Sequence, residues 1–151
     1  FQSNGSEVAS IDQAGLLTAT SFAGSAANLT GTLTGVNLKD VGLTTNAIGS
    51  IGGGAQTIDL TLGNSVTGTV DTSTTTFTFS NPTASDELCV FSLVLTNGGS
   101  QTVNFPSTVD WAGGTAPTLT TSGIDILIFA TIDGGTIWHG QTFSLDSKSP
   151  S

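Results

Sequence analysis

The two tryptophans and the one histidine of this chain are its best candidates for chemistry at a surface. Trp111 follows Asp110 in a Gly-rich segment, and Trp138 directly precedes His139. An indole ring beside carboxylate and imidazole groups is typical of sugar recognition, where the aromatic face stacks on the pyranose ring and the polar groups order its hydroxyls. We therefore take Asp110, Trp111, Trp138 and His139 as candidate contacts to a glycan or protein receptor. The alternative is that both tryptophans cap a hydrophobic core. In a regular strand Trp138 and His139 point to opposite faces, so one of the two is expected to be exposed.

Catalytic and metal-binding patterns are not indicated. A Ser-His-Asp hydrolase needs a histidine between an acid and a serine, and here only His139 is available, without a Gly-x-Ser-x-Gly elbow. Most carboxylates fall in turns or at strand edges, where solvated carboxylates are common. One Cys and one His do not make a zinc site. We expect no enzyme activity, no catalytic residues and no cofactor or metal ligands, with an ion on a symmetry axis left open.

The composition is poor in charge and strongly acidic. Charged residues make up 9% of the 151 residues, and eleven Asp and Glu face only two basic residues, Lys39 and Lys148, for a net charge of −9. A chain without arginine cannot neutralise a row of phosphates, so nucleic-acid binding is not expected, and anionic lipid would repel it. No apolar run approaches the roughly 20 residues that span a bilayer, so membrane insertion is not expected either. Cys89 is alone, which excludes an internal disulfide.

The first third of the chain differs in composition from the rest. Residues 1–6, FQSNGS, look like the remnant of a tag-removal site, and residues 7–54 are rich in Gly, Ser, Thr and Asn with scattered leucines. The phrases Leu29-Thr30-Gly31 and Leu33-Thr34-Gly35 form a short quasi-repeat. A single copy of this segment buries little apolar surface, whereas intertwined copies would bury more. We expect residues 7–54 to be shaft-like or intertwined, with Gly52–Gly54 as a hinge, or else to be a flexible linker.

From residue 55 onward the apolar residues recur with period two, which predicts β-strands. Ile58, Leu60 and Leu62 alternate with polar residues. The other expected strands cover residues 65–71, 74–80, 88–96, 101–105, 125–131, 136–139 and 141–147. The nearly continuous apolar runs at 88–96 and 125–131 predict central strands covered on both faces, and Asn97-Gly98-Gly99 predicts a hairpin that makes 101–105 the antiparallel partner of 88–96. The expected fold is all-β, with residues 55–151 forming an antiparallel, jelly-roll-like β-sandwich head.

Two segments also resemble a known family. The first is a Pro-x-x-Val-x-Trp-x-Gly-Gly-Thr-x-Pro run, followed by an apolar strand and Asp-Gly-Gly-Thr-x-Trp. Its positions here are Pro106, Val109, Trp111, Gly113, Gly114, Thr115 and Pro117, then Asp133, Gly134, Gly135, Thr136 and Trp138. The second is an aromatic-x-Gly-small-Leu-Thr-Gly phrase at Phe22, Gly24, Leu29, Thr30 and Gly31. Both resemble the C-terminal region of phage tail-fibre and related virion fibre proteins.

The resemblance implies a role and partners. It implies a homotrimeric structural protein of a phage virion, located in a tail fibre or capsid appendage, that contacts other virion proteins and attaches to a glycan or protein of the host surface. A trimer would also bury strand edges that a low-charge β protein otherwise exposes. Two alternatives stand beside it: a monomeric carbohydrate-binding or adhesin β-sandwich, and a capsid decoration protein that never contacts the host.

Overall fold

The computed structural model describes residues 2–3, 6–7, 9–11, 13–14, 17–19, 37 and 39–148. The chain divides into two compact units, Phe1–Lys39 and Asp40–Ser151. The first unit contains two small antiparallel pairs: β1 (Gln2–Ser3) with β2 (Ser6–Glu7), and β3 (Ala9–Ile11) with β4 (Leu17–Ala19). The Phe22 to Gly31 phrase lies outside the described residues.

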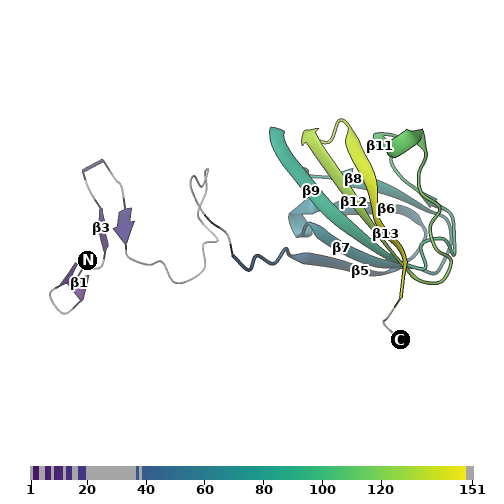
Figure 1. The fold of residues 1–151 in the computed structure, drawn as a ribbon, viewed down its shortest axis with the longest axis horizontal. Helices are drawn as coiled ribbons and strands as arrows, with labels where there is room; N and C mark the ends of the chain where they lie inside the picture. The colour runs from purple at the N-terminus through teal and green to yellow at the C-terminus, as the bar shows by residue number, and fades with distance from the viewer. Residues whose placement is uncertain are drawn as a thin grey trace. The chain divides into compact units, whose positions relative to one another are not determined.

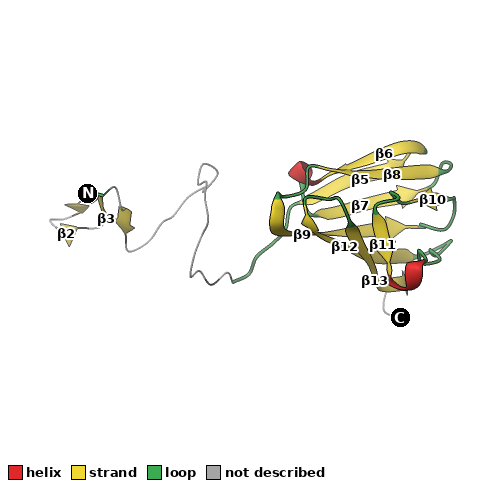
Figure 2. Cartoon of the chain, turned by 90° about the horizontal axis from the view of Figure 1, so that it is seen from above, coloured by secondary structure: helices red, strands yellow, loops and turns green. Residues whose placement is uncertain are grey.

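The second unit consists of two β-sheets that face each other (Figures 1 and 2). The larger sheet has six strands in the order β11-β13-β12-β9-β7-β5, and the smaller has three in the order β10-β8-β6. The six strands are β5 (Thr45–Ile51), β7 (Ser65–Val70), β9 (Ser85–Thr96), β11 (Val109–Trp111), β12 (Ile124–Asp133) and β13 (Trp138–Ser147). The three strands are β6 (Gly54–Asp59), β8 (Thr75–Ser80) and β10 (Val103–Asn104).

From β5 to β10 the chain alternates between the two sheets. β5, β7 and β9 are parallel neighbours in the large sheet, and β6, β8 and β10 are parallel neighbours in the small one. Each strand of one sheet is therefore followed by a strand of the other, so that the chain winds around the core. We call these six strands the parallel stack. Side chains of the same type lie side by side on neighbouring strands of the stack. The hydroxyls of Thr57 in β6 and Thr78 in β8, 21 residues apart in the sequence, lie 3.0 Å from each other.

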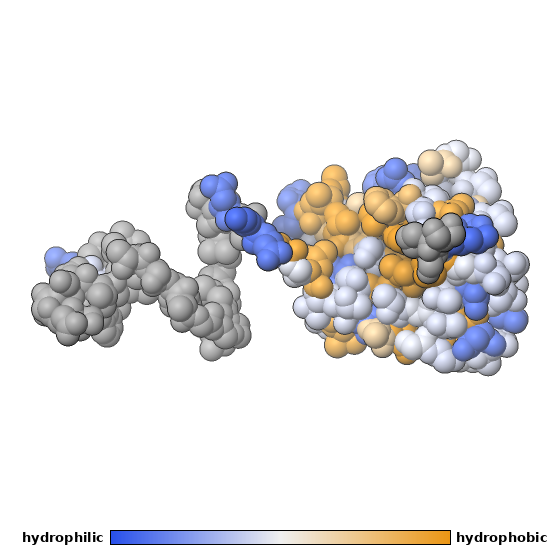
Figure 3. Space-filling model, turned by 60° about the horizontal axis from the view of Figure 1, so that its bottom comes forward, coloured by the Kyte–Doolittle hydropathy of each residue, from blue (hydrophilic) through white to orange (hydrophobic). Residues whose placement is uncertain are grey.

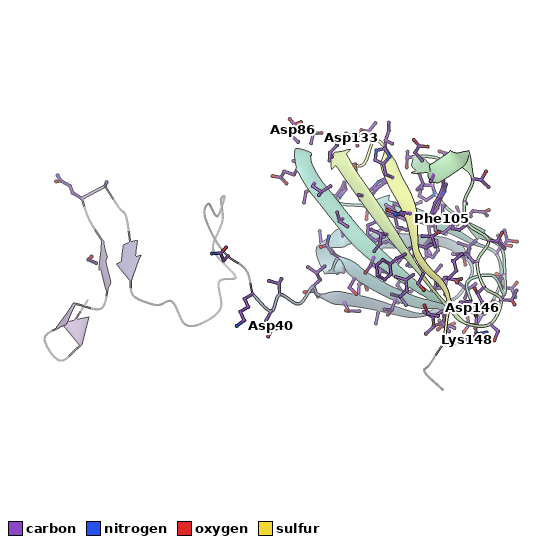
Figure 4. The ribbon with its side chains drawn as sticks, in the orientation of Figure 1. Asp40, Asp86, Phe105, Asp133, Asp146 and Lys148 are labelled. Carbon is purple, nitrogen blue, oxygen red and sulfur yellow. The ribbon has the colours of Figure 1, made fainter. Side chains whose placement is uncertain are left out.

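The remaining strands of the large sheet include its antiparallel pairings. β12 pairs antiparallel with both β9 and β13, and β11 returns as a parallel edge strand beside β13. We call β12 and β13 the antiparallel end. Figure 4 labels Asp86 and Asp133 near one end of β9 and β12, and Asp146 and Lys148 near the opposite end, at the end of β13; Phe105, also labelled, is partly buried against the core.

The core lies between the two sheets and is strongly aromatic. Phe77, Phe91, Phe129 and Trp138 are almost completely buried. The Phe91 ring stacks on Phe129 at 5.0 Å and meets the Trp138 ring edge-on at 5.4 Å. Aromatic pairs at such distances stabilise a core beyond the area that they bury. Because these rings come from β8, β9, β12 and β13, they join the parallel stack to the antiparallel end.

The strand pairings correct the expected antiparallel, jelly-roll-like sandwich. The chain is all-β, but its sheets are mixed, and the stack from β5 to β10 is parallel. The segment at 101–105 does not return beside 88–96; its strand β10 pairs with β8 in the other sheet. The alternation of apolar residues predicted the strands, but it carries no information about the direction of their partners.

Three local predictions also change. Gly52–Gly54 is not a hinge before the head, because β5 precedes it and belongs to the large sheet; Gly53 and Gly54 adopt positive φ where the chain crosses to the small sheet. The compact unit accordingly begins at Asp40 and not at residue 55. Leu60–Leu62 form a 3₁₀ turn, so Leu62 is 57% exposed instead of pointing into the core.

Among the described residues, the apolar runs in β9 and β12 are covered on one face only, and not on both as expected. Their inward side chains are buried, but Leu88 and Ile132 on the other face are 68% and 62% exposed. Within the described part of the chain, no helix has the length and apolar character needed to cross a bilayer.

Candidate ligand-binding site

The pairing of β11 with β13 brings three of the four candidate residues together. The two strands are parallel, with Asp110 beside His139 and Trp111 beside Gly140. The Trp138 amide donates to the Thr108 carbonyl at 2.9 Å, which fixes this register at its start. Asp110 and His139, separated by the whole of β12 in the sequence, therefore occupy neighbouring positions at the edge of the large sheet. Both side chains are exposed.

Trp111 is half-buried, and aromatic residues of the core contact its ring. Its ring meets those of Phe105 and Phe129 edge-on, at 5.0 and 5.5 Å. Gly140 makes this position possible, because a Cβ there would stand only 2.9 Å from the Cε3 and Cζ3 atoms of Trp111. The indole is thus fixed on the core-facing side of the sheet, against Phe105 and Phe129, and the residue remains partly accessible.

These residues line an open pocket with a volume of about 370 Å³. Its polar wall is formed by Asp110, His139 and Gln141, and its apolar wall by Trp111, Ala112, Ile128 and Ala130. A carboxylate, an imidazole and an amide beside apolar side chains combine hydrogen-bond donors and acceptors with an apolar contact surface. That combination suits a neutral polyhydroxylated ligand such as a sugar.

The hairpin between β12 and β13 positions the start of β13. The Asp133 carboxylate accepts hydrogen bonds from the Ile137 amide at 3.1 Å and the Thr131 hydroxyl at 2.7 Å. These donors, the Ile137 amide above all, lower the pKa of Asp133 because they stabilise its charged form. The Gly135 amide donates to the Thr131 hydroxyl at 3.1 Å, so Thr131 and Asp133 together close the loop. This loop leads directly into Trp138 and His139.

Trp138 does not belong to the pocket. It is 2% exposed, with its ring edge-on to Phe79 and Phe91 in the core. The expectation that Trp138 and His139 point to opposite faces is confirmed, and His139 is the exposed one. The burial of Trp138 leaves no ring surface for a ligand, so the structure favours the core-capping alternative for this residue.

Gln141, Ile128 and Ala130 are pocket residues that the sequence did not single out. Gln141 lies two residues beyond His139 in the same strand, so the period of two placed it on the same face. Ile128 and Ala130 pair with Gln141 and His139 across β12 and β13. Their contribution depends on this register, which the sequence pattern does not specify.

The pocket adjoins an apolar surface on the large sheet. Side chains that alternate with the buried residues of β9 and β12 form what we call the outer apolar face. Its members are Leu88, Val90, Val94, Ile124, Ile126, Ile128, Ala130 and Ile132. The register places Val90 beside Ala130 and Val94 beside Ile126, so the two rows are neighbours. Figure 3 shows apolar side chains gathered on the surface of the compact unit.

No cluster of three or more His, Cys, Asp or Glu side chains suited to a metal ion occurs among the residues that the structure describes. Comparisons with protein-family models, with curated proteins and with solved structures find no match to this chain.

Proposed function

We propose that this chain is a structural protein of a phage virion, part of a tail fibre or similar appendage, and that it contributes to attachment by binding a host surface glycan in the pocket beside Trp111. The observation that carries the binding role is the convergence of Asp110, Trp111 and His139, from two strands distant in sequence, on one open pocket. The appendage role rests on the resemblance of the Pro106–Trp138 segment to phage fibre proteins.

Surface charge supports a neutral ligand. The chain has a net charge of −9 and two lysines, so an anionic polysaccharide would be repelled, whereas a neutral sugar is not. The pocket is also open, which suits the shallow contact that a surface glycan makes with a few residues at a time. Affinity for one sugar unit would be low, and several copies of the head would add their contacts.

The outer apolar face supports a homotrimeric assembly. Leu88 and Ile132 leave large apolar areas in contact with water, and exposed contiguous apolar patches commonly mark protein–protein contacts. A homotrimer that covers part of this face would present three copies of the pocket around one axis. Other proteins of the virion are the further partners of such an appendage.

A printed array of bacterial surface polysaccharides, followed by titration calorimetry with the strongest binder, tests the binding role. We expect Asp110→Ala and His139→Ala each to weaken binding at least tenfold while the melting temperature stays within about 2 °C of the wild type, because both side chains are exposed. Glu87→Ala removes an exposed carboxylate outside the pocket and is the matched control. Binding that survives both pocket variants would refute the assignment of this pocket.

Light scattering after gel filtration tests the assembly. A trimer supports the appendage role. A chain that is monomeric at all concentrations but still binds glycan through Asp110 would instead support the alternative of a standalone carbohydrate-binding module. A trimer that binds no polysaccharide would favour a capsid decoration protein.

A further inference from the structure

We propose that the site beside Asp110 and His139 binds three consecutive units of a linear sugar chain, one unit in the pocket described above and one in a depression on each side of it along β13. This inference rests on the proposed glycan binding and deepens it. The ligand class becomes the interior of a neutral, linear polysaccharide instead of a single terminal sugar. We call the pocket beside Asp110 and His139 the central pocket.

The first flanking depression, which we call the upstream depression, has a volume of about 370 Å³. It is formed by residues 107–110 and by Thr136 and Ile137. Asp110 also lines the central pocket, so the two depressions adjoin at this carboxylate. Ile137 is 46% exposed and offers an apolar contact, while serine and threonine hydroxyls around it offer hydrogen bonds.

The second flanking depression, which we call the downstream depression, has a volume of about 240 Å³. It shares Ala112 and Gln141 with the central pocket and adds Thr115, Pro117 and Thr142. Its position follows from the unequal lengths of two strands. β11 ends at residue 111, whereas β13 continues to residue 147, so the register leaves residues 141–147 without a partner in β11.

The pairing of β11 with β13 sets the three depressions in one row. The upstream depression takes residues 136 and 137 from the start of β13 and the turn before it, the central pocket takes 139–141, and the downstream depression takes 140–142. The residues contributed by β11 and its flanking turns advance in the same order. From residue 137 to residue 142 an extended chain rises about 17 Å, which exceeds one sugar ring and suits a short oligosaccharide.

The chemistry along the row favours a neutral ligand. Among the described residues that line the three depressions, Asp110 and His139 are the titratable ones, and neither Lys nor Arg is present. Sulfate or carboxylate groups of an acidic polysaccharide would therefore meet no fixed cationic partner. Hydroxyl and amide groups beside small apolar areas instead match the alternating polar and apolar surfaces of a neutral sugar.

Adjoining sites also answer the weakness of each one. A single sugar in one open depression loses its overall freedom for few contacts. When the units are linked, that freedom is lost only once for all three, so each further unit adds contacts at a lower entropic cost. The affinity should therefore rise with chain length until the row is filled and then stay constant.

A ladder of oligosaccharides tests the proposal. Fragments of one to four sugar units are prepared by partial hydrolysis of the neutral polysaccharide that binds best on the array, and each is titrated into the full, isotope-labelled chain while amide chemical shifts are recorded. We expect Kd to fall at least tenfold from one unit to three and to change less than twofold from three to four. The amide signals of Ile137 and Thr142 should both move with the three-unit fragment.

Two variants test where the flanking units lie. Thr108→Val and Thr142→Val preserve the shape of an exposed side chain but remove a hydroxyl from the upstream and the downstream depression. Each should weaken binding of the three-unit fragment at least threefold more than binding of the one-unit fragment. Thr74→Val, at an exposed position outside the three depressions, is the matched control and should change neither.

The outcomes separate this inference from the proposed function. Equal affinity for one and three units, lost in Asp110→Ala, would overturn the row of three sites but keep a single-sugar pocket. Further tightening beyond three units, or an unchanged affinity of both threonine variants for the three-unit fragment, would also overturn the row. Absence of binding to any polysaccharide would overturn the glycan-binding role itself, and the row with it.

Discussion

The parallel stack and the antiparallel end bury the same aromatic core, but their strands are paired by contacts over different distances in the sequence. In the parallel stack every neighbouring strand is a whole winding away in sequence, as for Thr57 and Thr78. In the antiparallel end, β12 and β13 are joined by one tight loop whose carboxylate and hydroxyl groups satisfy its own amides. The first region is specified by long-range contacts and the second by short-range ones.

Two similar turns show what this difference means. Asp133-Gly134-Gly135 closes a hairpin because Asp133 and Thr131 bind the loop itself. After β9, Asn97-Gly98-Gly99 instead binds the segment before β12: the Asn97 amide donates to the Gly123 carbonyl at 2.7 Å, and the Gly99 amide to the Thr120 carbonyl at 2.9 Å. A Gly-rich turn ends a strand in both cases. Only after β12, where side-chain hydrogen bonds lie within the loop itself, does the next strand return as a hairpin partner.

The largest expected effect comes from a residue that both regions share. Trp138→Ala should lower the free energy of unfolding by about 3–5 kcal/mol, because it leaves a cavity between Phe79 and Phe91. Urea denaturation followed by circular dichroism measures it, and one cooperative transition is expected. A loss below about 1 kcal/mol, or two separate transitions, would show that the stack and the antiparallel end are independent.

A buried carboxylate should have the next largest effect. Asp125 is completely buried and accepts hydrogen bonds from the Thr120 amide and hydroxyl at 2.6 and 2.7 Å and from the Asp146 amide at 3.1 Å. Asp125→Ala should cost roughly 2–4 kcal/mol because three donors lose their acceptor. Asp125→Asn keeps one acceptor oxygen and should cost less. Equal losses in the two variants would mean that packing, not hydrogen bonding, is the contribution of Asp125.

The local closure of the hairpin should have a smaller effect. Thr131→Val preserves the shape of a buried side chain but removes the hydroxyl that contacts Asp133 and Gly135, at a cost of about 1–2 kcal/mol. Relative to the wild type, the variant should show faster amide hydrogen exchange in residues 133–138 and unchanged exchange in the parallel stack. Uniformly faster exchange across both sheets would contradict a local role.

Acid should weaken both regions slightly, through one carboxylate in each. The pKa of Asp59, at the end of β6, is lowered by the Asn81 amide and by the Thr61 hydroxyl and amide, and the pKa of Asp133 by the Ile137 amide and the Thr131 hydroxyl. A carboxylate with a lowered pKa in the folded state stabilises the protein above its unfolded value of 3.8, and this contribution disappears as the pH falls below 3.8 through the lower folded value.

Urea titrations between pH 2 and 6 measure this dependence. Asp59→Asn and Asp133→Asn should each flatten the loss of stability below pH 3.8, and the double variant should flatten it further. Unchanged pH dependence in both single variants would mean that these hydrogen bonds do not favour the charged form.

Much of the candidate site followed from short-range sequence features. The Asp-Gly-Gly turn predicted the β12–β13 hairpin, and the alternation at Trp138 and His139 predicted that one of them would be exposed. The same period of two points to Gln141. That Trp138 is the core residue and Trp111 the pocket residue depends on how β11 packs beside β13, which no local pattern specifies.

The sequence by itself determined that this chain is a low-charge, all-β protein and where most of its strands lie. It also determined that the side chains of Val66, Val70 and Phe77 point inward, because a period of two is a property of each strand alone. Only the tertiary structure decided that the strands from β5 to β10 run parallel, that the outer face of β9 and β12 is exposed among the described residues, and that Asp110 lies beside His139. Strand direction and partner choice follow from contacts between residues far apart in the chain, and these leave almost no trace in any one segment.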